Sequence, residues 1–230
     1  MDAQSLIACW ELGRRRHPLD RALLLYAAAE PEADPDTLAD RTIGERNAVL
    51  LGLRRSLFGD ALKSCVNCPE CAEQLEFELS VDALMAGAHH DAPPASLVDV
   101  GGRRARLPTT RDLACIAAEA DEGSAARKLS ARLLVANASD SPVPADELAN
   151  ALDAADPRMD FSLELSCPAC AHRWSASLDV PAFLWQELDV RARRLLDEVH
   201  ALALAYGWSE RQILSLGDAR RQAYLDRVLA

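Results

Sequence analysis

Two short cysteine turns repeat in this chain and carry its clearest chemical signal. Cys68-Pro69-Glu70-Cys71 recurs 99 positions later as Cys167-Pro168-Ala169-Cys170. Each turn directs two sulfur atoms toward one point, so the two turns together can supply the four thiolates of a tetrahedral zinc site. Four protein ligands leave no coordination position for water, which indicates a structural rather than a catalytic zinc.

The residues around both turns alternate between apolar and polar side chains. Apolar residues occupy every second position over residues 75–81 and again over residues 174–180. A period of two predicts β-strands. The stretches before the turns also correspond, since the 99-residue offset places Leu62 on Phe161. The repeat therefore predicts two strand–turn–strand units that meet at the four cysteines.

A fifth cysteine competes for a ligand role. Cys65 and Cys68 also have the Cys-x-x-Cys spacing of metal ligands. The offset pairs Cys65 with Glu164, a position expected to face outward, so the Cys-Pro-Glu-Cys pair is favoured. His172 could replace a cysteine, but its counterpart is Glu73, so an ordinary strand histidine is favoured.

Two other interpretations of the cysteine pairs stay open. One is four reduced thiols without a metal, and the other is a thiol-based redox protein that uses the Cys-Pro-x-Cys pairs. In thioredoxin-like sites the pair lies at a helix N-terminus, whose dipole lowers the thiol pKa. Both pairs here precede predicted strands, so that activation is missing and metal binding is favoured.

Composition and charge restrict the kind of partner. The chain has 230 residues, 50% of them hydrophobic, and a net charge of −11. The sequence has short arginine runs but no extended basic patch of the kind that nucleic-acid binders show, which disfavours nucleic acid and anionic lipid. Neither an apolar stretch of about 18 residues nor a signal-peptide pattern is found, so we expect no membrane span and no export. Seven cysteines in that context favour metal binding over disulfides.

The predicted elements give a mainly helical α+β fold with a split zinc-ribbon-like β unit. We expect an N-terminal helical segment over residues 1–60 and the two ribbon halves over residues 61–84 and 158–182. An inserted hairpin with helices is expected between the two halves, over residues 96–157, and a helical arm over residues 183–230. The two ligand pairs are therefore far apart in sequence, and a shared metal would close a long loop.

Local signals mark turns and helix starts. Gly101-Gly102 permits a tight hairpin turn, and Gly123 is expected to interrupt the helical region that follows. Two helix starts have the spacing of a capping box: Thr109 with Asp112, and Ser209 with Gln212.

The rest of the sequence offers no catalytic constellation. A P-loop, GxSxG, HExxH and a glycine-rich dinucleotide loop are all missing, so we expect neither an enzyme nor a small-molecule substrate. The arginine run at residues 191–194 is expected to be a solvated helix face. Trp185, Trp208 and Tyr224 are expected to cluster in the core. Apolar residues exposed on helices after Asp179 are expected to contact a partner.

A series of packing and capping motifs carries a resemblance to a known family. In chain order they are Cys167-Pro168-Ala169-Cys170, Trp174, Phe183-Leu184-Trp185, Glu198-Val199-His200, Tyr206-Gly207-Trp208-Ser209-Glu210, Ile213-Leu214, Arg220-Arg221 and Tyr224-Leu225. With Gly44-Glu45-Arg46, Leu57-Phe58-Gly59 and the hairpin before Leu107-Pro108-Thr109, the chain resembles the baseplate hub assembly chaperone family of contractile-tailed phages and phage-like contractile injection systems.

The resemblance covers most of the chain and implies a role in assembly, because none of its motifs is a catalytic signature. It implies baseplate or hub proteins of a contractile tail as partners and a cytoplasmic location during assembly. It leaves open whether the protein departs afterwards or stays in the released particle. The zinc prediction rests on the cysteines of this sequence and not on the family.

Overall fold

The computed structural model describes residues 1–87, 97–135 and 143–228. Its elements in chain order are α1 (Ala3–Gly13), α2 (Pro18–Ala29), α3 (Pro35–Asp40), α4 (Ile43–Phe58), β1 (Ala61–Asn67), β2 (Gln74–Ser80), α5 (Val81–Gly87), β3 (Val98–Val100), β4 (Arg103–Ala105), α6 (Thr110–Ile116), α7 (Glu122–Leu133), α8 (Ala145–Ala155), the 3₁₀ turn η1 (Pro157–Met159), β5 (Phe161–Ser166), β6 (Arg173–Leu178), α9 (Val180–Tyr206), α10 (Glu210–Leu214) and α11 (Asp218–Val228). Residue 96 and residues 136–142 of the predicted insertion lie outside the described residues.

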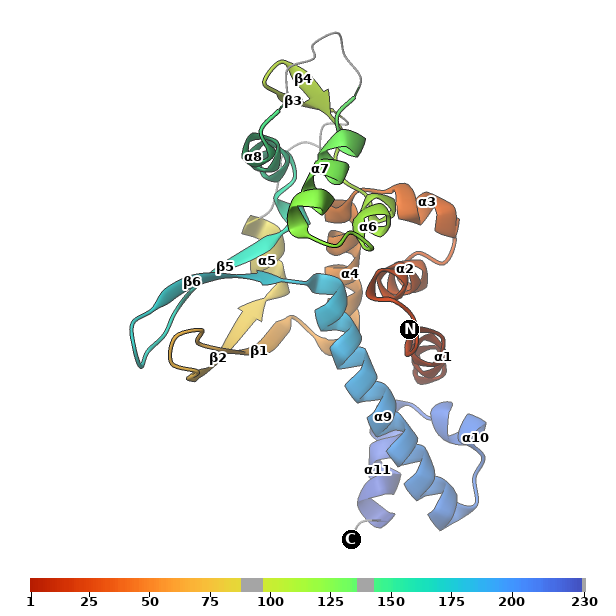
Figure 1. Ribbon diagram of the computed structural model, residues 1–230. Helices are drawn as coiled ribbons and strands as arrows, with labels where there is room; N and C mark the ends of the chain where they lie inside the picture. Colours follow the sequence, from red (N-terminus) through yellow and green to blue (C-terminus); the bar gives the residue numbers. More distant parts are fainter. Residues whose placement is uncertain (88–96, 136–142, 229–230) are drawn as a thin grey trace. The chain divides into compact units, whose positions relative to one another are not determined.

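The described chain is mainly helical, with short antiparallel hairpins between the helices (Figure 1). β1 pairs with β2, β3 with β4 and β5 with β6, each as a separate two-stranded sheet. The register places Leu62 opposite Leu79 and Phe161 opposite Leu178, so both strand–turn–strand units form where the repeat predicts them. The mainly helical α+β fold with a split, zinc-ribbon-like β unit is confirmed.

Contacts within the chain divide it into two compact units. The helical unit comprises residues 1–28 and 181–230, and the hairpin unit comprises residues 29–180. The predicted segment 1–60 therefore contributes to both units. All four predicted metal ligands belong to the hairpin unit.

The helical unit is built on one apolar face of α9. Residues at helical spacing along this face are buried: Leu184, Leu188, Ala192, Leu195 and Leu202. Trp10 of α1 donates a 2.6 Å hydrogen bond from Nε1 to Oδ1 of Asp189. A Cβ atom on Gly13 would lie 2.4 Å from the ring of Trp185. Glycine at that position therefore lets α1 and α9 approach closely.

The end of α9 and the helices after it form a second small core. Gly207 ends α9 with a φ of 68°, and Ser209 and Gln212 form the predicted capping box of α10. The buried residues of this core are Leu202, Ile213 and Leu225. Local signals thus set the chain reversal that brings α11 back to α9.

The three aromatic residues that were predicted to form one cluster occupy two places. The Trp208 ring stacks on Tyr206 at 4.7 Å between centroids and meets Tyr224 edge-on at 4.8 Å. Trp185 lies elsewhere, with its ring against Gly13 and beneath the guanidinium of Arg21 at 4.9 Å. The prediction missed this because the α1 partner of Trp185 is distant in sequence.

In the hairpin unit, a buried carboxylate lies against the start of α4. Asp156 is buried and pairs with Arg158 at 2.7 Å. A Cβ atom on Gly44 would lie 2.0 Å from Oδ2 of Asp156, so only glycine fits this position of α4. The positive end of the helix dipole favours a negative charge at this point.

The inserted hairpin packs on α7 and α8. Gly101 and Gly102 both have positive φ, 56° and 78°, as the predicted tight turn requires. The core beneath the hairpin contains Val100, Ala105, Leu107, Leu133, Leu148 and Leu152. The helical region is interrupted as expected, but at residues 117–121. Gly123 itself lies inside α7, so its prediction as the breaking residue is wrong.

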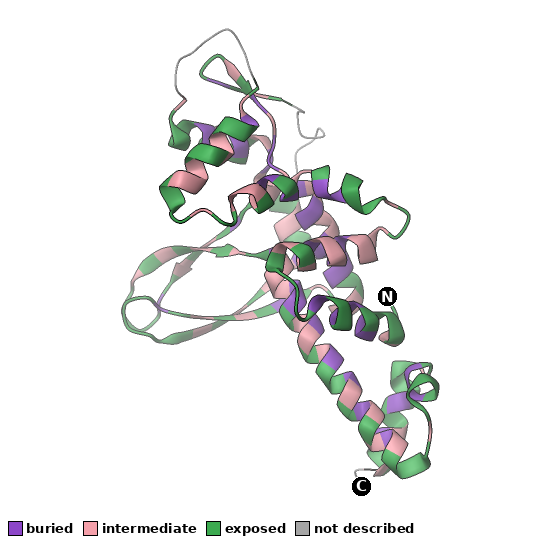
Figure 2. Cartoon of the chain, turned by 45° about the vertical axis from the view of Figure 1, so that its right-hand side comes forward, coloured by how far each residue is buried: buried purple, intermediate pink, exposed green. Residues whose placement is uncertain are grey.

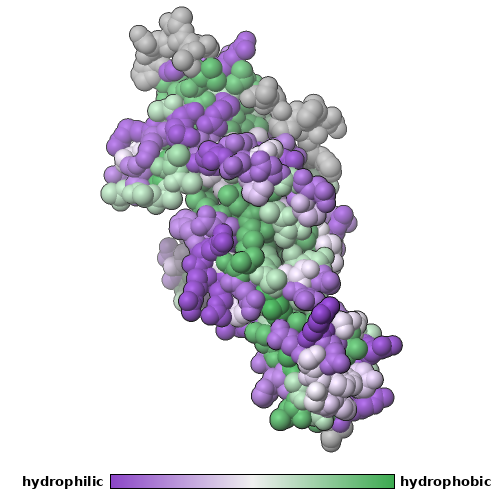
Figure 3. Space-filling model, turned by 90° about the vertical axis from the view of Figure 1, so that its right-hand side faces the viewer, coloured by the Kyte–Doolittle hydropathy of each residue, from purple (hydrophilic) through white to green (hydrophobic). Residues whose placement is uncertain are grey.

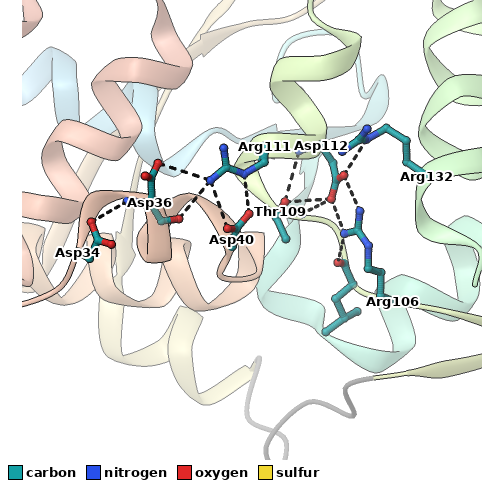
Figure 4. A network of polar contacts seen from close by, with 9 residues as sticks. Asp34, Asp36, Asp40, Arg106, Thr109, Arg111, Asp112 and Arg132 are labelled. Carbon is teal, nitrogen blue, oxygen red and sulfur yellow. Dashed lines mark hydrogen bonds and ion pairs between the residues drawn. The ribbon is translucent and has the colours of Figure 1, made fainter.

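A polar network centred on Asp112 caps α6 (Figure 4). Thr109 and Asp112 form the predicted capping box, and Asp112 is fully buried. Its carboxylate also accepts hydrogen bonds from Arg106 at 2.7 Å and Arg132 at 3.0 Å. Burial opposes ionisation, but the bonds from Arg106, Thr109 and Arg132 hold the pKa of Asp112 well below its usual range.

Candidate metal centre

Helix α4 fixes the bases of both cysteine-bearing hairpins. Buried Arg54 donates to the backbone carbonyls of Gly59 and Ala61, at the start of β1, at 2.6 and 2.7 Å. Buried Asn47 donates to the carbonyls of residues 158 and 159, just before β5, at 3.0 and 3.2 Å. Seven residues span about two helical turns, so both side chains lie on one face of α4. One helix therefore anchors two hairpins that are distant in sequence.

The hairpins themselves bury little apolar surface. Leu62 and Phe161 are buried at their bases. The other apolar residues of the alternating pattern are half-buried: Val66, Leu75, Phe77, Leu79, Leu163, Leu165, Trp174, Ala176 and Leu178. Figure 2 accordingly shows both hairpins almost entirely in the colours of intermediate and exposed residues. Two-stranded hairpins are marginally stable in water, so the far ends need another source of stability.

The two cysteine turns have the same backbone geometry. The N–H of Cys68 donates to the carbonyl of Glu73 at 2.8 Å, and the N–H of Ala72 donates to the carbonyl of Cys68 at 2.9 Å. The equivalent bonds within residues 167–172 are 2.8 and 2.9 Å long. Ala72 and Ala171 both adopt a φ of 60°, in the left-handed region that favours glycine. The sequence repeat is therefore a repeat of structure as well.

The structure brings the four predicted ligands together. The Sγ atoms of Cys68, Cys71, Cys167 and Cys170 all lie within 4.8 Å of one another. Two sulfur–sulfur distances of 3.6 Å join the turns, one from Cys68 to Cys170 and one from Cys71 to Cys167. The first cysteine of each turn is buried and the second is exposed. These residues form a cluster that can hold a metal ion.

The thiols of the cluster influence one another's ionisation. Burial opposes ionisation of Cys167, but the backbone N–H groups of Cys170 and Ala169 and the adjacent thiols lower its pKa to about 7. The backbone of Glu73 favours the Cys71 thiolate, yet the Cys170 sulfur, burial and the other sulfurs raise the pKa of Cys71 to about 12. Crowded thiolates repel one another, and a divalent cation among them removes that repulsion.

The competing candidates lie outside the cluster. Cys65 is exposed on β1 opposite Glu76, as the repeat predicts. The His172 ring stacks on Trp174 at 5.9 Å between centroids and is not part of the ligand group. Cys9 is buried in α1, where burial raises its pKa to about 11, so it is an unreactive packing residue.

The arrangement suits metal binding better than thiol catalysis. Both turns lead into strands, β2 and β6, so neither cysteine pair lies at a helix N-terminus. The helix dipole that activates redox cysteines is therefore missing from both pairs. Four sulfurs around one point fill a tetrahedral coordination sphere and leave no position for a substrate.

A buried charge cluster in the helical unit was not predicted from the sequence. Glu198 accepts a 2.6 Å bond from Arg221, with side chains 9% and 1% exposed. Arg191 and Arg194 bind the other Glu198 oxygen at 3.0 and 3.2 Å. The expectation of a solvated arginine face is therefore wrong for Arg191, which is 24% exposed. The spacing of Arg194 and Glu198, four residues apart on one helix, could have predicted one ion pair of this cluster.

Comparison with known proteins gives no relative for this chain. No protein-family model matches it, and neither does any curated protein or solved structure. Within residues 1–87, 97–135 and 143–228, none of the helices combines the length and apolar character needed to cross a membrane. The function is therefore inferred from the residues of the chain itself.

Proposed function

We propose that the protein is a non-catalytic assembly or structural protein of a contractile tail baseplate, with its hairpin unit stabilised by a structural zinc ion. The observation that carries the metal assignment is the convergence of four cysteine sulfurs within 4.8 Å. Zinc held by four thiolates in a closed site contributes to folding and takes no part in a reaction. A protein of this kind acts by binding other proteins.

The spacing of the sulfurs supports zinc. Tetrahedral zinc with bonds of about 2.3 Å places its sulfur ligands about 3.8 Å apart. The two distances of 3.6 Å in the cluster are close to this value. Four thiolates of this geometry also suit iron, so elemental analysis has to distinguish the two metals.

The baseplate assignment is supported by the family resemblance. Several motif residues cap or pack the helical unit: Gly207 ends α9, Ser209 caps α10, and Arg221 binds Glu198. Such residues preserve a shape and not a reaction, which suits a protein that presents surfaces to partners. The proposed partners are hub or adjoining baseplate proteins, met at a cytoplasmic stage of assembly.

Exposed apolar side chains on α9 are the proposed contact residues. Most apolar residues of α9 are buried or half-buried, so the remaining exposed apolar surface is smaller than the leucine content of the sequence suggests. Val190 and Leu204 are the most exposed of its large apolar side chains, at 67% and 80%, and Tyr206 is 38% exposed. On the face drawn in Figure 3, hydrophobic residues are scattered among hydrophilic ones. This favours a mixed contact surface over a single large apolar one.

A thiol-based redox protein is the second candidate. It is favoured by the exposure of Cys71 and Cys170, one in each Cys-Pro-x-Cys pair. A redox catalyst would reduce a disulfide substrate through many cycles with a thiol donor present. A structural metal protein would show no such turnover, and this assay separates the two functions.

Deletion of this gene, in cells that express the complete set of tail genes, tests the baseplate role. We expect particles without this protein to lack a normal baseplate in electron micrographs, and the tagged protein to co-purify with hub or adjoining tail proteins. Val190→Glu and Leu204→Glu should weaken co-purification, whereas Gln186→Glu, at an exposed position of the same helix, should not. Normal particles after deletion, with no tail protein co-purifying, would refute the proposal.

A further inference from the structure

We infer that the four-cysteine cluster is also a site of oxidative modification, at which its sulfurs join as two disulfides between the turns, Cys68 with Cys170 and Cys71 with Cys167. The starting state is the metal-bound cluster, so the inference rests on the proposed metal centre. The modification is stoichiometric, which distinguishes it from the turnover of a redox enzyme.

Two short sulfur–sulfur contacts support pairing between turns. Both sulfur contacts of 3.6 Å join a cysteine of one turn to a cysteine of the other. A disulfide needs about 2.05 Å between sulfurs, so each of these pairs closes with a small movement of two side chains. Within each turn, two backbone hydrogen bonds and a left-handed alanine hold the backbone, which resists the rearrangement that a within-turn disulfide would require.

Exposure favours the same pairing. Each close pair combines one exposed sulfur, Cys71 or Cys170, with one buried sulfur, Cys167 or Cys68. An oxidant from solvent therefore reaches one member of each pair first. The buried member then lies in contact with the oxidised sulfur, ready to attack it.

The oxidant required is a hydroperoxide such as hydrogen peroxide. The exposed thiolate attacks one peroxide oxygen, so an S–O bond forms, the O–O bond breaks and the leaving hydroxide takes a proton to become water. The buried thiolate then attacks the sulfenic sulfur, so the S–S bond forms, the S–O bond breaks and the leaving hydroxide takes a proton to become a second water. The formation of each disulfide transfers two electrons from the two sulfurs to one peroxide molecule.

Oxidation would release the metal and join the two turns covalently. Disulfide sulfurs are no longer thiolate ligands, so two such reactions release the metal as a divalent cation. Disulfides between the turns keep the tips of the two hairpins together, whereas disulfides within the turns would leave the tips unconnected. Oxidation is therefore expected to preserve the fold of the hairpin unit while it empties the metal site.

Peroxide treatment of the full-length metal-bound protein tests this inference. We expect one metal ion released per two disulfides, and non-reducing peptide mapping by mass spectrometry to find the links 68–170 and 71–167. Links within the turns, or links to Cys65, would overturn the inference. A chain that binds no metal would refute the metal proposal instead, while the disulfide map would still decide the pairing.

Matched double variants isolate the effect of pairing. Cys71→Ser with Cys167→Ser leaves the close pair between turns, and Cys167→Ser with Cys170→Ser leaves the pair within the first turn. Each variant loses two ligands, so only the location of the remaining pair differs. We expect the pair between turns to form its disulfide about tenfold faster or more, because its sulfurs start in contact. Equal rates, or a faster reaction within the turn, would contradict the inference.

Discussion

The helical unit and the hairpin unit differ in charge and in the way they are held together. The helical unit carries 11 of the 25 Lys and Arg residues and 10 of the 36 Asp and Glu residues, whereas the hairpin unit carries 14 and 26. The net charges are therefore +1 and −12, so the acidity of the chain belongs to the hairpin unit. An acidic unit suits contact with a basic protein surface.

The difference in burial explains why a metal ion would stabilise the hairpin unit more than the helical unit. The apolar face of α9 is buried along its length, so hydrophobic burial holds the helical unit. In the cysteine-bearing hairpins, burial is complete only near the bases, where Leu62 and Phe161 lie. The tips meet at the cysteine cluster, and a metal ion there can replace the missing core.

Metal removal is expected to have the largest effect and to act on the hairpin unit. A metal that joins the two turns closes the loop of residues 72–166, which is 95 residues long. By analogy with a disulfide, closing such a loop stabilises the fold by roughly 4–5 kcal/mol. A strong chelator should lower Tm and raise amide hydrogen exchange in β1, β2, β5 and β6. Unchanged exchange there, or an equal rise in α9, would contradict the comparison.

Loss of the buried glutamate should have the largest effect on the helical unit. Glu198→Ala leaves Arg221 buried without its carboxylate, which is expected to cost about 3–5 kcal/mol. Asp218→Ala is the control, because Asp218 also pairs with Arg221 but is 78% exposed, and it should cost less than about 1 kcal/mol. Urea unfolding measures both. If the two variants lose similar amounts of stability, burial of the Glu198–Arg221 pair is unimportant.

Asp112 should make the stability of the hairpin unit depend on acid. Its pKa is lowered in the folded state, so its contribution is present above the unfolded pKa of about 3.9 and is lost as pH falls through the folded pKa. Asp112→Asn should cost about 1–3 kcal/mol at pH 7. The difference in the free energy of unfolding between wild type and variant, measured by urea unfolding, should shrink below pH 4. A gap that is constant with pH would contradict this account.

Relief of backbone strain in the turns should give the smallest effect. Ala72→Gly and Ala171→Gly should each stabilise the protein by about 1 kcal/mol, because both residues have a φ of 60°. Ala169→Gly in the same turn is the control, since Ala169 is not among the residues with positive φ, and it should stabilise nothing. Thermal unfolding of the metal-bound protein measures all three. A gain in the control equal to that in the others would remove strain as the cause.

The parts of the fold that depend on local sequence could be predicted. The period of two around each cysteine turn predicted the hairpins, and spacing alone predicted the capping boxes at Thr109 and Ser209. The 99-residue offset correctly placed Cys65 on the outward face. Each hairpin and each capping box is determined by residues near it in the sequence, and the repeat compares two such local patterns. Sequence patterns therefore reveal them.

The parts that depend on distant contacts could not be predicted. Asn47 and Arg54 look like ordinary polar residues of a helix, yet they are buried beneath the bases of both hairpins. Gly44 is explained by Asp156, which lies more than a hundred positions away. Glu198 gains its role from Arg221 on another helix. Pattern alone does not reveal which charged residues will meet after folding.

Metal content of the purified chain is the most direct test of the central claim. We predict one zinc ion per chain by elemental analysis and native mass spectrometry, retained in Cys65→Ser and lost in Cys170→Ser. These two variants change exposed cysteines of the same unit, and only Cys170 belongs to the cluster. Well under half an equivalent of zinc in the wild type, iron in its place, or loss of zinc in Cys65→Ser would contradict the account.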